Sequence, residues 1–266
     1  MDKTTIIGVI LGVLAVGVGM VLKGVEVTAL FNPAAFLIIF AGTAAAVMIA
    51  FPASELKKVP ALIKIIFKEQ ELPPASELID TFSGWANTAR AEGLLALETK
   101  LDDIDDPFLQ NGMRLAIDGQ SPDFIRDVLN EELDAMEERH LAGASIFTQA
   151  GTYAPTLGVL GAVVGLIAAL GHMEDTGALG KAIAAAFIAT LFGIFSGYVL
   201  WHPFANKLKQ KSRQEIFLKR IIIEGVLSIQ EGQSSMVIRD KLASYLPAGQ
   251  REQLDQQEFA GELENA

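Results

Sequence analysis

The chain has 266 residues, of which 51% are hydrophobic, and its formal net charge at pH 7 is −11. A mean hydropathy of +0.37 is too apolar for a typical soluble protein and excludes a disordered chain or a collagen-like fibre. The absence of cysteine excludes disulfide scaffolds, iron–sulfur clusters and thiol nucleophiles, and the acidic balance argues against a nucleic-acid partner.

Four segments carry no Asp, Glu, Lys or Arg and have about the length of a membrane span. A helix rises about 1.5 Å per residue, so about 20 residues cross a hydrocarbon core of ~30 Å. A cleaved signal peptide is the alternative for the first segment, but a second apolar segment follows at once and no cleavage site leads into a soluble domain. The sequence predicts four transmembrane helices, at residues 4–22, 33–51, 153–173 and 182–201.

Basic residues gather after the second and the fourth predicted span. The short connections 23–32 and 174–181 hold one lysine each. Cytoplasmic segments carry the excess of lysine and arginine, so both long polar segments and both termini are predicted to be cytoplasmic. The basic residues are Lys57, Lys58, Lys64 and Lys68 in the long connection and Lys207, Lys209, Lys211 and Arg213 after the last span.

The polar parts of the chain read as helices. A helix is predicted over 56–67, Pro73 and Pro74 break it, and the pattern of 77–101 is typical of one long amphipathic helix. Ser121 or Asp123 caps a further helix that has no stop signal before the third span. Because no strand pattern is found, the predicted fold is all-α.

The predicted organisation alternates membrane and cytoplasmic parts. A large helical cytoplasmic domain lies between two pairs of spans, a helical segment with its amphipathic part at 215–245 follows the last span, and the polar end of the chain is predicted to be disordered. The boundaries are 1–52 for spans one and two, 53–149 for the cytoplasmic domain, 150–203 for spans three and four, 204–247 for the C-terminal helices and 248–266 for the tail.

The predicted spans lack the ionisable residue that normally marks an ion path. Two histidines near the membrane, His172 and His202, are predicted at opposite faces, too far apart to share a metal. No nucleophile–base pair, phosphate loop or ligand cluster indicates an enzyme, a metal site or a cofactor. If the protein moves ions, another chain must supply the carboxylate.

Small residues recur at helical spacing in the last two spans. Such stripes let helices approach closely in a membrane, either within one chain or between chains. Two stripes on adjacent spans favour an oligomer that encloses a partner helix. The residues are Gly161 and Gly165 in span three and Ala185, Ala189, Gly193 and Gly197 in span four.

Prolines and threonines are the polar exceptions in these spans. Pro155 has no N–H, so the carbonyl of Gly151 needs another partner, such as the Thr156 hydroxyl, a water molecule or a partner helix. Thr190 lies in the middle of span four and is expected to bond its own helix. Pro203 is predicted to end the fourth helix.

Three stretches together resemble the MotA family, the ion-conducting stator subunits of the bacterial flagellar motor. They are TYAPTLGVLGAVVGL in span three, AAFIATLFGIFSGY followed by WHPFANKLK at span four, and ANTARAEGLLALE in the cytoplasmic domain. The resemblance covers residues 1–247 and is greatest to the Bacillus-type, proton-driven form. The more distant ExbB and TolQ relatives have three spans, so four spans and a long second connection fit MotA better.

The resemblance implies an assembly and a set of site residues. Five MotA chains surround two copies of MotB in the inner membrane, the MotB span supplies the essential Asp, and the ring turns against FliG on the rotor. By position, Arg90 and Glu98 match the charged residues that face FliG, Pro155 and Pro203 match two functional prolines, and Thr156 and Thr190 match hydroxyls near the ion path. Eight residues apart on one helix, Arg90 and Glu98 would lie about 80° apart, near one face.

Other functions stay open on the sequence. A sodium-driven stator subunit and an ExbB- or TolQ-like energiser of envelope processes share the same pattern. A self-contained transporter is weakened by the missing membrane charges, and a purely structural scaffold would need no coupling threonine or proline. Co-purification of a single-span, peptidoglycan-binding partner separates the stator from the last two.

Overall fold

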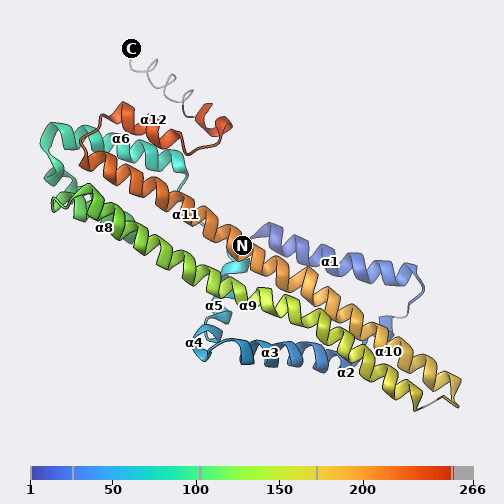
Figure 1. Ribbon diagram of the computed structural model, residues 1–266. Coiled ribbons are helices and arrows are strands. Elements are labelled where there is room, and N and C mark those ends of the chain that lie inside the picture. Colours follow the sequence, from blue (N-terminus) through green and yellow to red (C-terminus); the bar gives the residue numbers. More distant parts are fainter. Residues whose placement is uncertain (1, 26, 102–103, 172, 253, 255–266) are drawn as a thin grey trace. The chain divides into compact units, whose positions relative to one another are not determined.

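The computed structural model describes residues 2–25, 27–101, 104–171, 173–252 and 254. These residues form helices and connections without a strand, which confirms the predicted all-α fold (Figure 1). They divide into two units, one built from the chain up to Gln70 with Arg139–Lys211, the other from Glu71–Glu138 and the chain from Ser212 onward. The predictions for His172 and for the tail beyond residue 254 fall outside the described residues.

The first unit contains the apolar helices. Four helical stretches are long and apolar enough to cross a membrane, Lys3–Leu22, Pro33–Ala50, Pro122–Leu170 and Thr176–Gln230, and each contains one predicted span or nearly all of it. The elements of this unit are α1 (Lys3–Leu22), η1 (Val27–Leu30), α2 (Pro33–Phe36), the π-helical η2 (Leu37–Ala41), α3 (Gly42–Ala50), α4 (Ala53–Leu56), α5 (Val59–Phe67), the later part of α9 (Pro122–Leu170), α10 (Thr176–Phe195), the π-helical η4 (Ser196–Trp201) and the beginning of α11 (His202–Gln230).

Side-chain caps set where three of the spans begin. The carboxylate of Asp2 accepts a hydrogen bond from the Thr5 N–H, the amide oxygen of Asn32 accepts from the Ala35 N–H, and Asp175 accepts from two backbone N–H groups of α10. Each cap satisfies backbone donors that the first turn of a helix leaves unpaired. The sequence therefore fixes these boundaries locally.

The prediction that Pro203 ends the fourth helix is wrong. Helix α10 continues through η4 into α11, and the His202 N–H bonds the carbonyl of Gly197, five residues earlier. A π turn of this kind widens the backbone ladder by one residue. We attribute the continuity of the helix to this turn, because it lies where a proline would otherwise displace the carbonyl one turn before it.

The second unit is a helical domain with its own hydrophobic core. Phe82 and Ile222 are among the fully buried side chains, and a Cβ added at Gly225 of α11 would lie 2.6 Å from the Phe82 ring of α6. The missing side chain at Gly225 thus lets α6 pack closely on α11. The elements of this unit are α6 (Ala75–Glu92), η3 (Leu94–Leu97), α7 (Glu98–Leu101), α8 (Pro107–Ile117), the first part of α9, the later part of α11 and α12 (Ser235–Ala243).

The long helix predicted over 77–101 is broken. Helix α6 ends at Glu92, and Gly93 has φ of +87° and ψ of +165°, a conformation that is essentially restricted to glycine. A short 3₁₀ turn then leads into α7. The apolar periodicity continues across Gly93 because leucines on both sides face the same core, so the pattern alone concealed the break.

Two further predictions for this unit concern the beginning of α9 and the end of the chain. The Ser121 hydroxyl accepts a hydrogen bond from the Phe124 N–H, as predicted for a cap of α9, and α9 then runs unbroken to Leu170. Disorder was predicted from residue 248, but residues 248–252 are helical and Leu254 is buried. Arg239 holds this end of the chain by donating to the Leu254 carbonyl. Residue 253 and residues beyond 254 lie outside the described part.

Candidate functional site

Helices α9 and α10 pack with their backbones in contact. A Cβ added at Gly193 would lie 2.7 Å from the Ala154 carbonyl oxygen and 2.8 Å from the Gly158 Cα. A Cβ added at Gly165 would lie 3.0 Å from the Cβ of Ala186. Most of the small-residue stripe therefore packs inside one chain, between helices α9 and α10, which lie side by side in Figure 1.

Pro155 lies inside α9, against α10. A Cβ added at Gly197 would lie 2.7 Å from the Pro155 Cγ and 2.8 Å from the Gly151 carbonyl oxygen. Pro155 cannot supply the N–H that this carbonyl would accept from in a regular helix, and the Gly197 backbone packs against the carbonyl. Gly197 is buried, and no larger residue would fit there.

The hydroxyl of Thr156 does not take the place of the missing donor. Its Oγ1 lies 3.3 Å from the Thr152 carbonyl oxygen, to which it donates. Thr152 in turn donates to the Thr148 carbonyl at 3.1 Å. Thr148, Thr152 and Thr156 therefore form one polar stripe on α9, because residues four apart share a helix face.

Thr190 lies on α10, and its hydroxyl is 3.5 Å from the Ala186 carbonyl oxygen, as expected for a membrane threonine. Its neighbour Ala189 packs on Gly161, so Thr190 lies about five residues, roughly 7.5 Å, along α9 from the level of Thr156. The two hydroxyls line neighbouring helices at different depths. Within one chain they do not form a common site.

Pro203 does not contact this turn of α9 in the same way as its neighbour His202, whose ring lies against Gly151. Pro203 itself is exposed, but a Cβ added at Gly151 would lie 2.8 Å from Cγ of the His202 ring. The His202 ring also lies against the Tyr198 ring, with centroids 5.4 Å apart and the ring planes tilted by 45°. The turn around Gly151 and Pro155 is thus enclosed by Gly197 and His202. Both residues stand out in the sequence, one in the small-residue stripe and one as a histidine near the membrane, but the sequence places neither at this turn.

Arg90 and Glu98 do not share a helix. Arg90 lies in the last turn of α6, Glu98 is the first residue of α7, and the break at Gly93 lies between them, so the 80° relation expected for one helix is wrong. Both side chains are exposed. Lys100 donates to the Thr88 hydroxyl at 2.9 Å and joins α7 to α6.

A charged cluster at the beginning of α1 was missed from the sequence. The Asp2 carboxylate lies 2.5 Å from the Lys207 ammonium and 3.8 Å from that of Lys211, and the Asp2 N–H donates to the Phe67 carbonyl. The buried Lys211 also donates to the carbonyls of Ile65, at 2.6 Å, and Lys68. Three elements, α1, α5 and α11, therefore meet at these groups, although Asp2 and Lys207 are far apart in sequence.

The two buried charges in this cluster have shifted pKa values. Burial raises the pKa of the Asp2 carboxyl, but hydrogen bonds from Lys207, Thr4 and the Thr5 N–H outweigh it and hold the pKa well below its ordinary range. Burial lowers the pKa of Lys211, and the nearby Asp2 carboxylate partly offsets this effect. Asp2 is therefore ionised at neutral pH.

Comparison with known proteins matches nearly the whole chain. Residues 6–93 match the family model for the N-terminal part of motility protein A, and residues 100–220 match that of the MotA/TolQ/ExbB proton channel family. Motility protein A of Bacillus subtilis is 63% identical over 265 residues, which cover 100% of this chain and 97% of the relative.

Two solved structures share the fold. The flagellar MotAB stator complex from Bacillus subtilis contains a chain that matches with a TM-score of 0.91 and 64% identity, covering 95% of this chain and 99% of that one. A chain of MotAB from C. jejuni matches with a TM-score of 0.88 and 31% identity, covering 93% of this chain and 97% of its own length.

Proposed function

The chain belongs to the MotA/TolQ/ExbB proton channel family, and from this we infer that it is a stator subunit of a bacterial flagellar motor. The observation that carries the inference is the full-length similarity to motility protein A together with the fold of a MotAB stator chain. It is a multi-pass membrane protein that works in an oligomer with a MotB-type partner.

The composition of the spans supports a role in which the MotB-type partner supplies the group that carries the proton. The four apolar segments carry no ionisable side chain apart from tyrosine and the histidine at position 172, so this chain offers no carboxylate to relay a proton. We propose that two MotB-type chains supply the Asp and that five copies of this chain surround them. Proton flow past that Asp is then coupled to torque; sodium is the alternative ion.

The turn around Pro155 is the proposed point of coupling. Pro155 leaves the Gly151 carbonyl without its helical N–H, and the Gly197 backbone packs against it, so we propose that protonation on a neighbouring helix changes the hydrogen bonding of this turn. Thr156 lies on the exposed side of this turn and Thr190 on the next helix. Because α9 is continuous from Pro122 to Leu170, a change in this turn also changes the direction of the helix that carries it.

Arg90 and Glu98 are proposed to contact FliG on the rotor. Both side chains are exposed on consecutive elements of the second unit, and the bond between Lys100 and Thr88 holds these elements together. Each copy in a ring would present the same pair of charges. The contact is then repeated around the ring although each surface pair contributes only about 0–1 kcal/mol.

Co-purification and motility test the proposal. The tagged chain should co-purify a single-span, peptidoglycan-binding protein. Deletion of the gene that encodes this chain should leave flagella that do not rotate. A protonophore should stop swimming in sodium-containing medium, whereas removal of sodium alone should not. Rotation without the chain would overturn the stator assignment, and sodium-dependent swimming would select the sodium-driven alternative.

Topology can be tested in the same cells. We propose that both termini are cytoplasmic in the inner membrane, because the basic residues follow spans two and four. The chain has no cysteine, so a single introduced cysteine is a clean reporter. A membrane-impermeant maleimide should label Thr28→Cys from outside and Ser244→Cys only after lysis. The reverse pattern would overturn the orientation.

A further inference from the structure

A hollow of about 420 Å³ opens between the beginning of α1 and the junction of α10 with α11. Its lining changes character along α1. Thr4, Thr5 and Lys207 line one end, whereas Gly8, Val9 and Val199 line the other. Gly8 lies five residues beyond Lys3, roughly 7.5 Å further along the helix. This is about the distance from the headgroup layer to the acyl chains of a bilayer.

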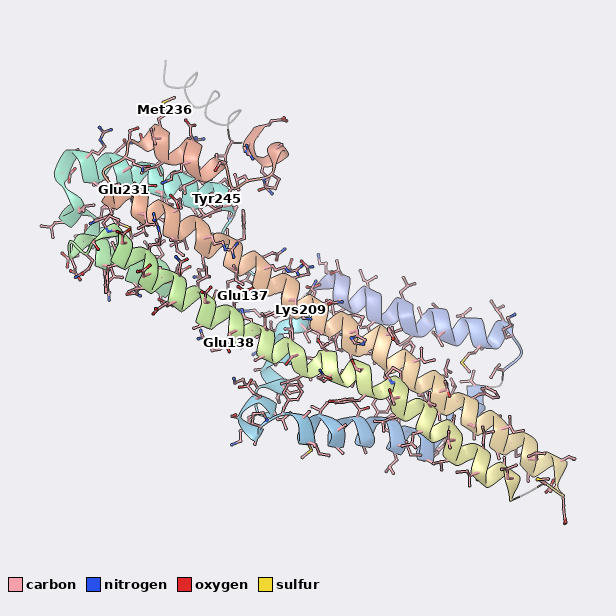
Figure 2. The ribbon with its side chains drawn as sticks, in the orientation of Figure 1. Glu137, Glu138, Lys209, Glu231, Met236 and Tyr245 are labelled. Atoms are coloured by element: carbon pink, nitrogen blue, oxygen red, sulfur yellow. The ribbon has the colours of Figure 1, made fainter. Side chains whose placement is uncertain are left out.

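The polar end of the hollow is cationic at Lys207, the one charged residue among those that line it. Lys207 donates to the Thr4 hydroxyl at 3.2 Å and pairs with Asp2, and the Lys211 ammonium lies 3.8 Å from the same carboxylate. Glu69 is a second acidic neighbour of Lys211, so Lys211 is the more fully neutralised of the two lysines. Lys3 begins α1, and Figure 2 shows Lys209 on α11 near the beginning of α1.

We propose that this hollow binds one anionic phospholipid of the cytoplasmic leaflet. The phosphate lies at Lys207 and the Thr4 and Thr5 hydroxyls, and an acyl chain runs along Gly8 and Val9. Basic pockets between membrane helices on the cytoplasmic side have the chemistry that binds anionic headgroups. Tyr198 and Pro203 also line the hollow, so it borders the residues that enclose the coupling turn, whereas Pro155 itself does not line it.

A second copy of the chain fits the hollow less well than a lipid. Its spans contain no Asp or Glu that could meet the cationic end, whereas a lipid brings a phosphate at this depth. The apolar end also has spare room, because a Cβ added at Gly8 meets nothing within 4 Å. A flexible acyl chain can fill such a space without any change in the protein.

The test fills the hollow while leaving the charges in place. Gly8→Leu puts a side chain into it and raises the helix propensity of α1. Gly19→Leu is the matched control on the same helix, because Gly19 also has nothing within 4 Å and does not line the hollow. Lys207→Gln removes the cation while keeping a polar side chain. Each variant is purified as the full complex with its MotB-type partner and titrated with phosphatidylglycerol or phosphatidylcholine in native mass spectrometry.

We expect wild type and Gly19→Leu to bind phosphatidylglycerol at least tenfold more tightly than phosphatidylcholine. Gly8→Leu should weaken phosphatidylglycerol binding at least tenfold, and Lys207→Gln should abolish the preference between the lipids. Unchanged phosphatidylglycerol binding in Gly8→Leu, or equal binding of both lipids by wild type, would overturn the proposal. A benzophenone attached at Gly8→Cys should form adducts with lipid; adducts with a second copy of the chain would overturn it as well. These readouts need no motor rotation, so their failure is distinct from failure of the stator assignment.

Discussion

At the scale of single residues, one turn of α9 combines a missing donor with two close neighbours. Pro155 frees the Gly151 carbonyl, Gly197 covers that carbonyl, and the His202 ring lies against Gly151. In a membrane a carbonyl without a donor costs several kcal/mol. Because Pro155 cannot supply that donor, we expect this turn to be less stable than the rest of the helix.

Replacing Pro155 by Ala should leave the complex assembled and stop or slow the motor. Alanine restores the N–H bond to the Gly151 carbonyl and stabilises α9, which removes the flexible turn that we propose for coupling. Rotation of tethered cells and the yield of detergent-extracted complex are measured together. Full rotation at normal yield would show that Pro155 is only a tolerated kink.

Replacing Asp2 by Asn should destabilise the complex by about 1–3 kcal/mol at neutral pH, because hydrogen bonds to a charged carboxylate are lost. The pKa of Asp2 is below its ordinary value of 3.8 in the folded chain, so its stabilisation is complete above that value and is lost as pH falls through the folded pKa. The difference in thermal midpoint between the Asp2→Asn variant and wild type should be constant from about pH 5 to pH 8. A difference that grows between pH 8 and pH 5 would contradict this origin.

At the scale of elements, a single glycine decides how the exposed charges of the second unit are presented. Gly93 ends α6 in a conformation that side chains rarely adopt, and α7 restarts at Glu98. Arg90 therefore projects from the end of the 18-residue helix α6 and Glu98 from the four-residue helix α7. The angle between these elements depends on Gly93 and on the bond between Lys100 and Thr88.

Gly93→Ala should lower the thermal midpoint, because a residue with a Cβ in this conformation costs about 1–3 kcal/mol. Gly84→Ala is the matched control in α6. Gly84 has ordinary helical geometry with open space around it, so alanine there should stabilise by about 0.5–1 kcal/mol. Scanning fluorimetry of the purified complexes compares the two variants. Equal changes in thermal midpoint for the two substitutions would show that a side chain at position 93 causes no backbone strain.

Arg90→Glu should impair swimming without loss of membrane insertion, because the residue is exposed and outside the hydrophobic core. One surface ion pair contributes only about 0–1 kcal/mol, so the effect depends on repetition around the ring. Swimming speed is measured at matched protein level, and a reversed charge on FliG should partly restore it. Normal swimming of the variant would contradict the proposed contact between Arg90 and FliG.

At the scale of the whole molecule, the chain supplies helices that can surround an ion path but no carboxylate within its spans that could bind the ion. Its apolar helices pack through glycine and alanine, and in the part of the chain that the structure describes no cluster of three His, Asp or Glu side chains converges. A cluster of poorly exposed charged groups of the first unit lies at the beginning of α1, where Asp2 pairs with Lys207 and Lys211. The ring and its partner must therefore complete the path.

Vesicles that contain only this chain should show no more proton flux than empty vesicles, since the spans have no carboxylate. A pH-sensitive dye inside the vesicles reports the flux after a membrane potential is applied. Co-reconstitution with the MotB-type partner is the positive control. Clear flux through the chain alone would contradict the division of roles between the two subunits.

The sequence by itself determined the features that depend on local composition. Apolar segments of membrane length predicted the four spans, and the Ser121 cap predicted the beginning of α9, because helix burial and capping use neighbouring residues. The motifs around Pro155, Thr190 and Pro203 also indicated the family. The absence of charges in the spans indicated that, if the protein moves ions, another chain supplies the carboxylate.

Only the tertiary structure decided the features that depend on residues far apart in the chain. Small residues suit contacts within a chain and between chains equally well, so only the packing of Gly158 on Gly193 showed that a contact within the chain is made. The helix passes Pro203 because a π turn redistributes its hydrogen bonds, which no local propensity encodes. The sequence did not single out Asp2, because its partner Lys207 comes close only when α1 packs beside α11.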